Sequence, residues 1–511
     1  MSEFDESAMT AKVDEVLNHW PVAGLAVGVV RTGSTSWFHG QGVADLASNT
    51  PITEDTVFRI ASITKTFTAI AVMQLWEQGL VDLDAPANDY LRGYKMVPAK
   101  AGFRPATLRH LLTHTAGVRA VRGPSDLLDS TLGWGSRADR LRMPLADYYR
   151  GGLCVDVEPG TKWAYSNHGF ATLGQIIEDV SGRPLDDYFR ERLFQPLGME
   201  NSDLIRSGRV RPHLATGYAL GSGGLKAVTD YEVVTAGGGA VYSTTKDMTR
   251  YAAALLNGGA NEHGSVLKPE TVTQMFEPHY QPDLRIPGMG LGFFRQEVGG
   301  HRTVRHDGIW KGFLSDLVLA PDDGIGVLAF ANTGSFNPRG APTPVANALL
   351  RVLLDLPHDA VRTDVPERPQ HWSELCGWYS FGPGVLLDPQ QRALLGAGLE
   401  VVVRGDHLTI RGQTPVPAVR RGLRLHPDGD DPYGFRIDTS GLGAGTSSVV
   451  FSRAPGGRVA ALHLGLMPMS FHKRPGLRNP RPWVNGTLAA IIAAIAIHRR
   501  RTARGQARAK R

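Results

Sequence analysis

The sequence predicts an α/β fold in which one antiparallel sheet takes strands from both ends of the first 358 residues. Strand-like runs rich in Val, Ile and small apolar residues occur near the N-terminus and again after residue 300, and helical patterns fill the chain between them. A single sheet with an inserted helical block buries all of these apolar faces. After residue 370 the pattern changes to short strands separated by turns, which predicts a second, antiparallel β domain.

Apolar periodicity and turn residues place the elements of the first domain, residues 1–358. A helical pattern covers residues 6–19, and Thr32, Gly33 and Ser34 separate the two strand-like runs that follow, as in a hairpin. A long amphipathic helix is expected from Ser62 to residue 78, with Gly79 as its C-cap. Further helices are expected at residues 108–113, 169–180, 185–193, 245–256 and 345–354, and strands at residues 23–30, 36–43, 303–306, 313–320 and 325–331.

The rest of the chain is predicted to form a linker at 359–370, a β-barrel-like domain at 371–472 and a basic tail at 473–511. The tail holds 11 Lys and Arg and no acidic residue, so the rest of the chain has a balance of −5 although the whole chain is +6. The folded body therefore gives little support to nucleic-acid binding. Strands of the barrel are expected at residues 377–381, 399–404, 407–411, 434–439, 448–453 and 458–464.

The tail also contains an apolar run, residues 483–497, that is shorter than the roughly 20 residues of a membrane-spanning helix. Two interpretations stay open for it: a short helix docked on the protein, or weak contact with a membrane surface through apolar residues and basic flanks. The two cysteines and the acidic N-terminus without an apolar segment favour a cytoplasmic protein, possibly peripheral at the membrane.

Nucleophilic chemistry is indicated by Ser62-Ile-Thr-Lys65. Positions i and i+3 of a helix share one face, so the amine lies within reach of the hydroxyl. A serine needs a base to become a nucleophile, and a lysine can act as that base at neutral pH if burial or a nearby cation lowers its pKa. Two other S-x-x-K sequences, at Ser243 and Ser470, have a weaker setting, since the first precedes a helix as a cap and the second lies near the basic tail.

Two further motifs can complete such a site. Tyr165-Ser-Asn167 offers a phenol for proton transfer and an amide for hydrogen bonding, and His306-Asp-Gly308 lies on a strand where glycine permits close approach of a substrate. Taken alone, Tyr165 and His306 would be ordinary structural residues. His114 is interpreted as structural, because no H-E-x-x-H accompanies it. The sequence has neither G-x-S-x-G nor a phosphate-binding loop, and no metal or cofactor is expected.

In order and spacing, these motifs resemble those of class C β-lactamases and their relatives, the serine β-lactamase-like D,D-peptidase family. The resemblance covers roughly residues 10–355 and includes the stretches Leu111–Gly117, Pro159–Asn167 and Pro196–Met199 and the glycines before Ser243. It implies a β-lactamase/transpeptidase-like fold, here followed by a lipocalin-like domain.

The resemblance also implies the roles of the site residues. Ser62 would be the acylated nucleophile, and Lys65 and Tyr165 its acid–base pair. Asn167 would bind Lys65 and the substrate, and the N–H groups of Ser62 and Ile309 would form the oxyanion hole. The substrate-binding set is therefore Asn167, His306, Gly308 and Ile309.

One departure from the family pattern bears on the substrate. His306 stands where many members have the lysine of K-T-G, which binds a carboxylate. We therefore expect a serine hydrolase that forms an acyl-enzyme from an ester or amide, of the esterase or D-aminopeptidase type, and not an efficient β-lactamase. The alternatives are an acyl transferase or peptide cyclase similar to penicillin-binding-protein-type thioesterases, and a non-catalytic sensor that is acylated without turnover. The partner is a small ester, amide or peptide, and the sequence leaves the oligomeric state open.

Overall fold

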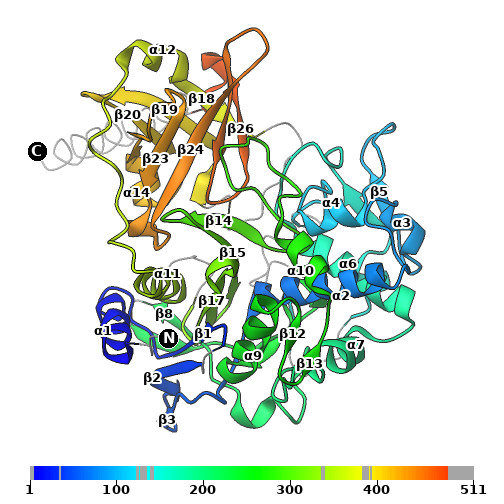
Figure 1. Ribbon diagram of the computed structural model, residues 1–511. Helices are drawn as coiled ribbons and strands as arrows, with labels where there is room; N and C mark the ends of the chain where they lie inside the picture. Colours follow the sequence, from blue (N-terminus) through cyan, green and yellow to red (C-terminus); the bar gives the residue numbers. More distant parts are fainter. Residues whose placement is uncertain are drawn as a thin grey trace, which may run out of the picture.

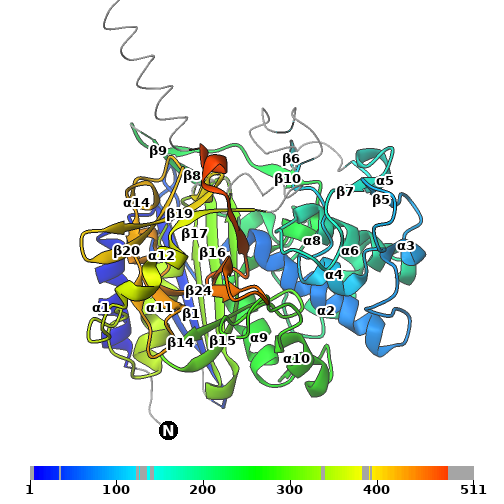
Figure 2. The same cartoon turned by 90° about the horizontal axis from the view of Figure 1, so that it is seen from above.

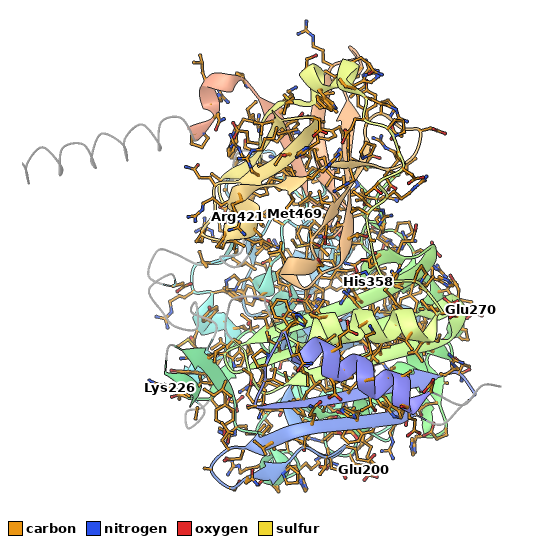
Figure 3. All side chains as sticks on the ribbon, turned by 90° about the vertical axis from the view of Figure 1, so that its left-hand side faces the viewer. Glu200, Lys226, Glu270, His358, Arg421 and Met469 are labelled. Atoms are coloured by element: carbon orange, nitrogen blue, oxygen red, sulfur yellow. The ribbon has the colours of Figure 1, made fainter. Side chains whose placement is uncertain are left out.

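The computed structural model describes residues 5–33, 36–121, 126, 135–137, 143–221, 223–334, 340–381, 391 and 394–480. Its first domain has three layers: two helices, a central sheet and a larger helical block, which Figure 2 shows from left to right. The second domain is a β-barrel-like body that lies against one edge of this assembly (Figure 1). In the view of Figure 3, Arg421 and Met469 lie in the barrel, Lys226 and Glu200 lie in the first domain, and His358 lies between the two.

The central sheet has seven strands in the order β14-β15-β16-β17-β1-β2-β3, with each described pairing antiparallel. N-terminal strands thus lie beside strands from after residue 300, as the sequence predicts. The hairpin β1–β2 and the strands β16 and β17 confirm the expected runs. The strands are β1 (Gly24–Arg31), β2 (Trp37–Asp45), β3 (Thr50–Pro51), β14 (Phe294–Val298), β15 (His301–Trp310), β16 (Phe313–Ala320) and β17 (Ile325–Ala331).

Successive side chains of each strand point to opposite faces of the sheet, so one part of the apolar core lies against each helical layer. On β16, Val318 packs toward α1 (Glu6–Leu17) and α11 (Pro342–Leu353), whereas Leu317 and Leu319 pack toward the helical block. Both faces of this strand are buried, and its sequence is mostly apolar, interrupted by Ser315 and Asp316.

The centre of the helical block is α2 (Thr64–Glu77), and here the expectation of an amphipathic helix is wrong. Every residue from Thr64 to Leu75 is buried, because other elements enclose the helix, among them α6 (Asn167–Ser181), α8 (Ala236–Gly239) and η3 (Arg190–Phe194). The helix also begins two residues later than expected, after a 3₁₀ turn, η1 (Ala61–Ile63), that carries Ser62. Gly79 follows the helix with a φ of 69°, as expected of a C-cap glycine.

The second domain contains one antiparallel sheet of nine strands in the order β21-β20-β19-β18-β26-β25-β24-β23-β22. The two outermost strands are joined by the single buried residue Leu425, so the sheet curls back on itself as a nearly closed barrel. The strands are β18 (Gly377–Ser380), β19 (Gly398–Arg404), β20 (His407–Gly412), β21 (Leu423–Arg424), β22 (His426–Pro427), β23 (Gly434–Asp438), β24 (Thr446–Arg453), β25 (Val459–Leu464) and β26 (Ser470–Arg474).

The last strand corrects the position expected for Ser470. Ser470 is the first residue of β26, and its Oγ shares a hydrogen bond of 2.9 Å with Nδ1 of His463. It therefore belongs to the barrel and not to the tail region. The apolar run at 483–497 and its basic flank lie outside the described residues. Within the part of the chain that the structure describes, we find no helix with the length and apolar character needed to cross a membrane.

The barrel core is continuous with the first domain. Its apolar cluster includes Trp163, Met289 and Phe294 of the first domain, and Tyr165 packs against it. An ion pair at 2.6 Å between Arg285 and Asp431 reinforces the junction. The barrel therefore forms part of the surroundings of the Y-x-N motif.

Candidate active site

Ser62 lies on the turn η1 between the sheet and the helical block. The residue before it, Ala61, has a φ of 45°, a left-handed conformation that is costly for a residue with a Cβ. Neighbouring elements hold this conformation: Thr64 Oγ1 donates to the Ala61 carbonyl oxygen at 2.6 Å, and Ser315 Oγ donates to that of Ile60 at 2.8 Å. The strained turn lets Ser62 face a cavity while its neighbours Ala61 and Ile63 are buried.

Lys65 is fully buried and its Nζ donates to three acceptors. These are Ser62 Oγ at 3.0 Å, Asn167 Oδ1 at 2.7 Å and the Gly238 carbonyl oxygen at 2.6 Å. A carbonyl oxygen can only accept, so two N–H groups stay directed at Asn167 and Gly238 when Lys65 loses a proton. The lone pair then faces Ser62 Oγ, which is the arrangement of a general base beside its nucleophile.

The glycine run before Ser243 makes the third of these contacts possible. A Cβ at Gly237 would lie 2.6 Å from the Phe170 carbonyl oxygen, and one at Gly238 would lie 3.1 Å from the carbonyl oxygen of Asn167. The backbone of α8 can therefore approach α6 closely enough to place the Gly238 oxygen beside Lys65. The sequence showed the run but not its partner.

Tyr165 lies in an aromatic enclosure beside Lys65. The Lys65 Nζ is 4.8 Å from the centre of its ring, and the His114 ring centre is at 4.3 Å. Phe294 is stacked parallel to Tyr165 with ring centres 6.4 Å apart, and His306 is at 6.3 Å. The ring of Tyr165 is thus fixed between the nucleophile's base and strand β15.

His306 is buried and electrically neutral. Burial and the nearby Lys65 ammonium lower its pKa to about 3. Its Nδ1–H donates to the Asp307 carbonyl oxygen at 2.7 Å, so the unprotonated nitrogen is Nε2, and this buried atom has no hydrogen-bond partner among the described residues. His306 therefore presents a lone pair, whereas a lysine at this position would present a positive charge.

His114, interpreted as structural, belongs to the same group. Its Nδ1 accepts a hydrogen bond from the Ser166 backbone N–H at 3.2 Å, so its neutral form carries the proton on Nε2. Burial, Lys65 and His306 all lower its pKa well below the usual value. Its ring packs on Tyr165, and it has a φ of 56°. The motif Leu111–Gly117 is the sequence signal that could have indicated this contact.

Strand β15 runs past the turn that carries Ser62 and offers an open edge. Its pairing with β14 ends at Arg305, so residues 306–310 have a described partner strand only on the side of β16. Gly308 lies against Ile60, and Ile309 lines the same cavity as Ser62. An edge of this kind can take the backbone of an extended ligand.

A cavity of about 510 Å³ opens at Ser62. The first domain lines it with Ser62, Tyr165, Asn167 and Ile309, and the barrel covers it with a largely apolar wall. That wall includes Leu394, Val416, Leu442, Leu466 and Met467. Among the described residues no group of three His, Cys, Asp or Glu side chains is placed to hold a metal ion.

The fold thus gathers most of the residues singled out in the sequence. Ser62 and Lys65, Tyr165 and Asn167, and His306 converge from three separate segments, and Gly308 and Ile309 lie beside them. The other two S-x-x-K serines lie elsewhere. Ser243 is buried and its hydroxyl shares a hydrogen bond with that of Ser202, and Ser470 lies in the barrel.

Comparisons with known proteins agree with this geometry. The Beta-lactamase family model matches residues 10–351. The chain belongs to the Beta-lactamase family. This confirms the predicted fold class and identifies a serine hydrolase of that family.

Two curated relatives and one solved structure illustrate the similarity. "Unguisins hydrolase ungD'" from Aspergillus campestris is 28% identical over 390 residues, which cover 72% of this chain and 67% of that protein. A "D-aminopeptidase" from Brucella anthropi is 27% identical, over 70% of this chain and 64% of that protein. The crystal structure of SurE is 26% identical with a TM-score of 0.59, and the match covers 92% of this chain and 98% of SurE.

Proposed function

We propose that this protein hydrolyses esters or amides through an acyl-enzyme on Ser62, and that its substrates do not depend on a free carboxylate. Lys65 takes the Ser62 proton as the hydroxyl attacks the substrate carbonyl. Tyr165 gives its proton to the leaving group and is reprotonated by Lys65. In a second step water attacks the acyl-enzyme, and Lys65 takes the water proton and returns it to Ser62 Oγ as the acyl group leaves. The observation that carries this proposal is the contact of Lys65 Nζ with Ser62 Oγ at 3.0 Å, with its other donors held by two carbonyl oxygens.

Substrate positioning follows from groups that remain available. Because Asn167 Oδ1 accepts from Lys65, its Nδ2 is left to donate to a substrate carbonyl oxygen. The N–H groups of Ser62 and Ile309 are proposed to stabilise the oxyanion that forms on the attacked carbonyl. The edge of β15 next to Gly308 takes the extended part of the substrate.

The substrate class follows from the neutral state of His306. Among the described residues that line the cavity, Arg305 is the only cation, and it is ion-paired with Asp316 at 2.5 Å. Lys65 is completely buried and contacts the lining residue Ser62. A buried, neutral imidazole at position 306 supplies no positive charge for a substrate carboxylate. This supports an esterase or D-peptidase activity, and the names of two relatives, an unguisins hydrolase and a D-aminopeptidase, point the same way.

The decisive experiment is intact-protein mass spectrometry after reaction with a fluorophosphonate and with p-nitrophenyl acetate. We expect one adduct in the wild type and in the matched controls Ser243→Ala and Ser470→Ala, and none in Ser62→Ala. An adduct that survives Ser62→Ala would reject the assignment. Product analysis with an added amine then separates hydrolysis from acyl transfer.

A further inference from the structure

The cavity continues past Ser62 around the open edge of β15 to the other face of the sheet. Successive side chains of a strand point to opposite faces. Gly308 faces the turn of Ser62, whereas Asp307 lies opposite Asp316 of β16. On that face Arg305 donates to Asn347 of α11 at 3.0 Å. Asp307, Asp316 and Arg305 all line the cavity, so it joins the nucleophile to a second, charged chamber.

This chamber has more negative than positive charge. Asp316 is completely buried, and its Oδ2 accepts from Arg305 at 2.5 Å and from Thr343. Its other oxygen, Oδ1, has no hydrogen-bond partner among the described residues. The Asp307 carboxylate has no hydrogen-bond or ion-pair partner among the other described residues, and burial and the Asp316 charge raise its pKa. One arginine therefore faces two carboxylates.

A buried acceptor without a partner is costly, and it indicates that a donor belongs in the space beside it. The second chamber is open to the cavity on one side and covered by the barrel segment 442–444 on the other; Gly443 lies against Pro344 of α11. The apolar wall formed by Leu394, Leu466 and Met467 is continuous with it. The space therefore combines a negative end with an apolar flank.

We propose that Asp307 and the free oxygen of Asp316 form a subsite for a primary ammonium group carried on an apolar chain. This inference rests on the proposed function, because it names the substrate class of the same cavity. The ammonium donates to both carboxylates and balances the charge of the chamber, and its apolar chain lies along the barrel wall on the way to Ser62. Two carboxylates and an arginine favour an ammonium, whose three N–H donors match separate acceptors.

The experiment measures binding of hexylammonium chloride by calorimetry to the full chain carrying Ser62→Ala, which keeps the cavity and cannot be acylated. We expect saturable binding that is at least about tenfold weaker when Asp307→Asn is added, the usual effect of losing a charge-assisted hydrogen bond. The neutral analogue 1-hexanol should bind the two variants equally. Glu297→Gln, which removes an exposed charge on the adjacent strand β14, is the matched control and should leave hexylammonium binding unchanged.

Three outcomes would overturn the inference: equal affinity for hexylammonium with and without Asp307, an equal loss of hexanol binding, or full displacement of hexylammonium by an equimolar amount of MgCl₂. Asp307→Glu guards against misfolding, since it retains a carboxylate and should bind hexylammonium more tightly than Asp307→Asn. Labelling of wild-type Ser62 by p-nitrophenyl acetate is measured in parallel. Absent labelling would reject the proposed function, whereas labelling without ammonium binding would reject this inference alone.

Discussion

The α-carbon of Gly308 lies so close to the carbonyl oxygen of Ile60 that a Cβ at position 308 would be 2.2 Å from that oxygen. The same Cβ would be 2.2 Å from Ser315 Oγ, which donates to Ile60. Strand β15 and the turn of Ser62 are therefore in direct backbone contact. This contact fixes the distance between the nucleophile and the open strand edge that we assign to the substrate.

Gly308→Ala is expected to lower kcat/KM for p-nitrophenyl acetate by on the order of 10²-fold, because the turn must move away from the strand by about the size of a methyl group. The matched control is Gly208→Ala, where an added Cβ meets nothing within 4 Å. Steady-state kinetics of both variants provide the test. Full activity of Gly308→Ala would show that the close contact does not position Ser62.

Lys65→Ala and Tyr165→Phe should each lower the rate of Ser62 acylation by on the order of 10²–10⁴-fold, the usual contribution of general acid–base catalysis. The Lys65 Nζ lies 4.8 Å from the ring centre of Tyr165, so we expect the two groups to serve one proton path. The double variant should therefore lose much less than the product of the single effects. Burst kinetics of the three variants measure their acylation rates. A double variant whose loss equals the product of the two single losses would contradict a shared path.

Stability should depend on the protonation of His306. Its pKa in the folded protein is about 3, below the ordinary value of 6.5, so below pH 6.5 the unfolded chain binds a proton that the folded one does not. The stabilising contribution is present above pH 6.5 and is lost as the pH falls toward 3. We expect His306→Gln to show a shallower decline in the free energy of unfolding, by up to about 1.4 kcal/mol per pH unit.

Urea unfolding at several pH values between 4 and 7 measures this slope. The exposed His358, labelled in Figure 3, supplies the control variant His358→Gln, which should keep the wild-type slope. A slope of His306→Gln equal to that of the wild type would mean that His306 protonates equally in the folded and unfolded states.

The neutral imidazole also predicts how the enzyme treats β-lactams. Penicillin G and its methyl ester differ only in the carboxylate, so a site without a carboxylate-binding cation should be acylated by the ester at least as fast as by the acid. Short acyl esters or D-residue amides should be turned over faster than either. The rates of adduct formation decide this, and a preference for the free acid of about tenfold or more would reveal a carboxylate site.

The sequence by itself determined the family and the antiparallel sheet built from both chain ends, and it predicted candidate site residues that the structure brings together. These follow from local information: predominantly apolar runs specify strands such as β16 and β17, and the three motifs carry their chemical groups in short stretches. Ser62 could be separated from Ser243 and Ser470 because a strand precedes it and a helix follows.

Only the tertiary structure decided which groups meet across the fold. The Gly238 oxygen reaches Lys65 because glycines allow α8 to approach α6, and the sequence gives no distance between those helices. The helix α2 is buried all round because other elements enclose it, which its own periodicity cannot show. The contact of His114 with Tyr165 and the chamber of Asp307 and Asp316 arise in the same way, since burial and pairing are set by neighbours that lie far apart in the chain.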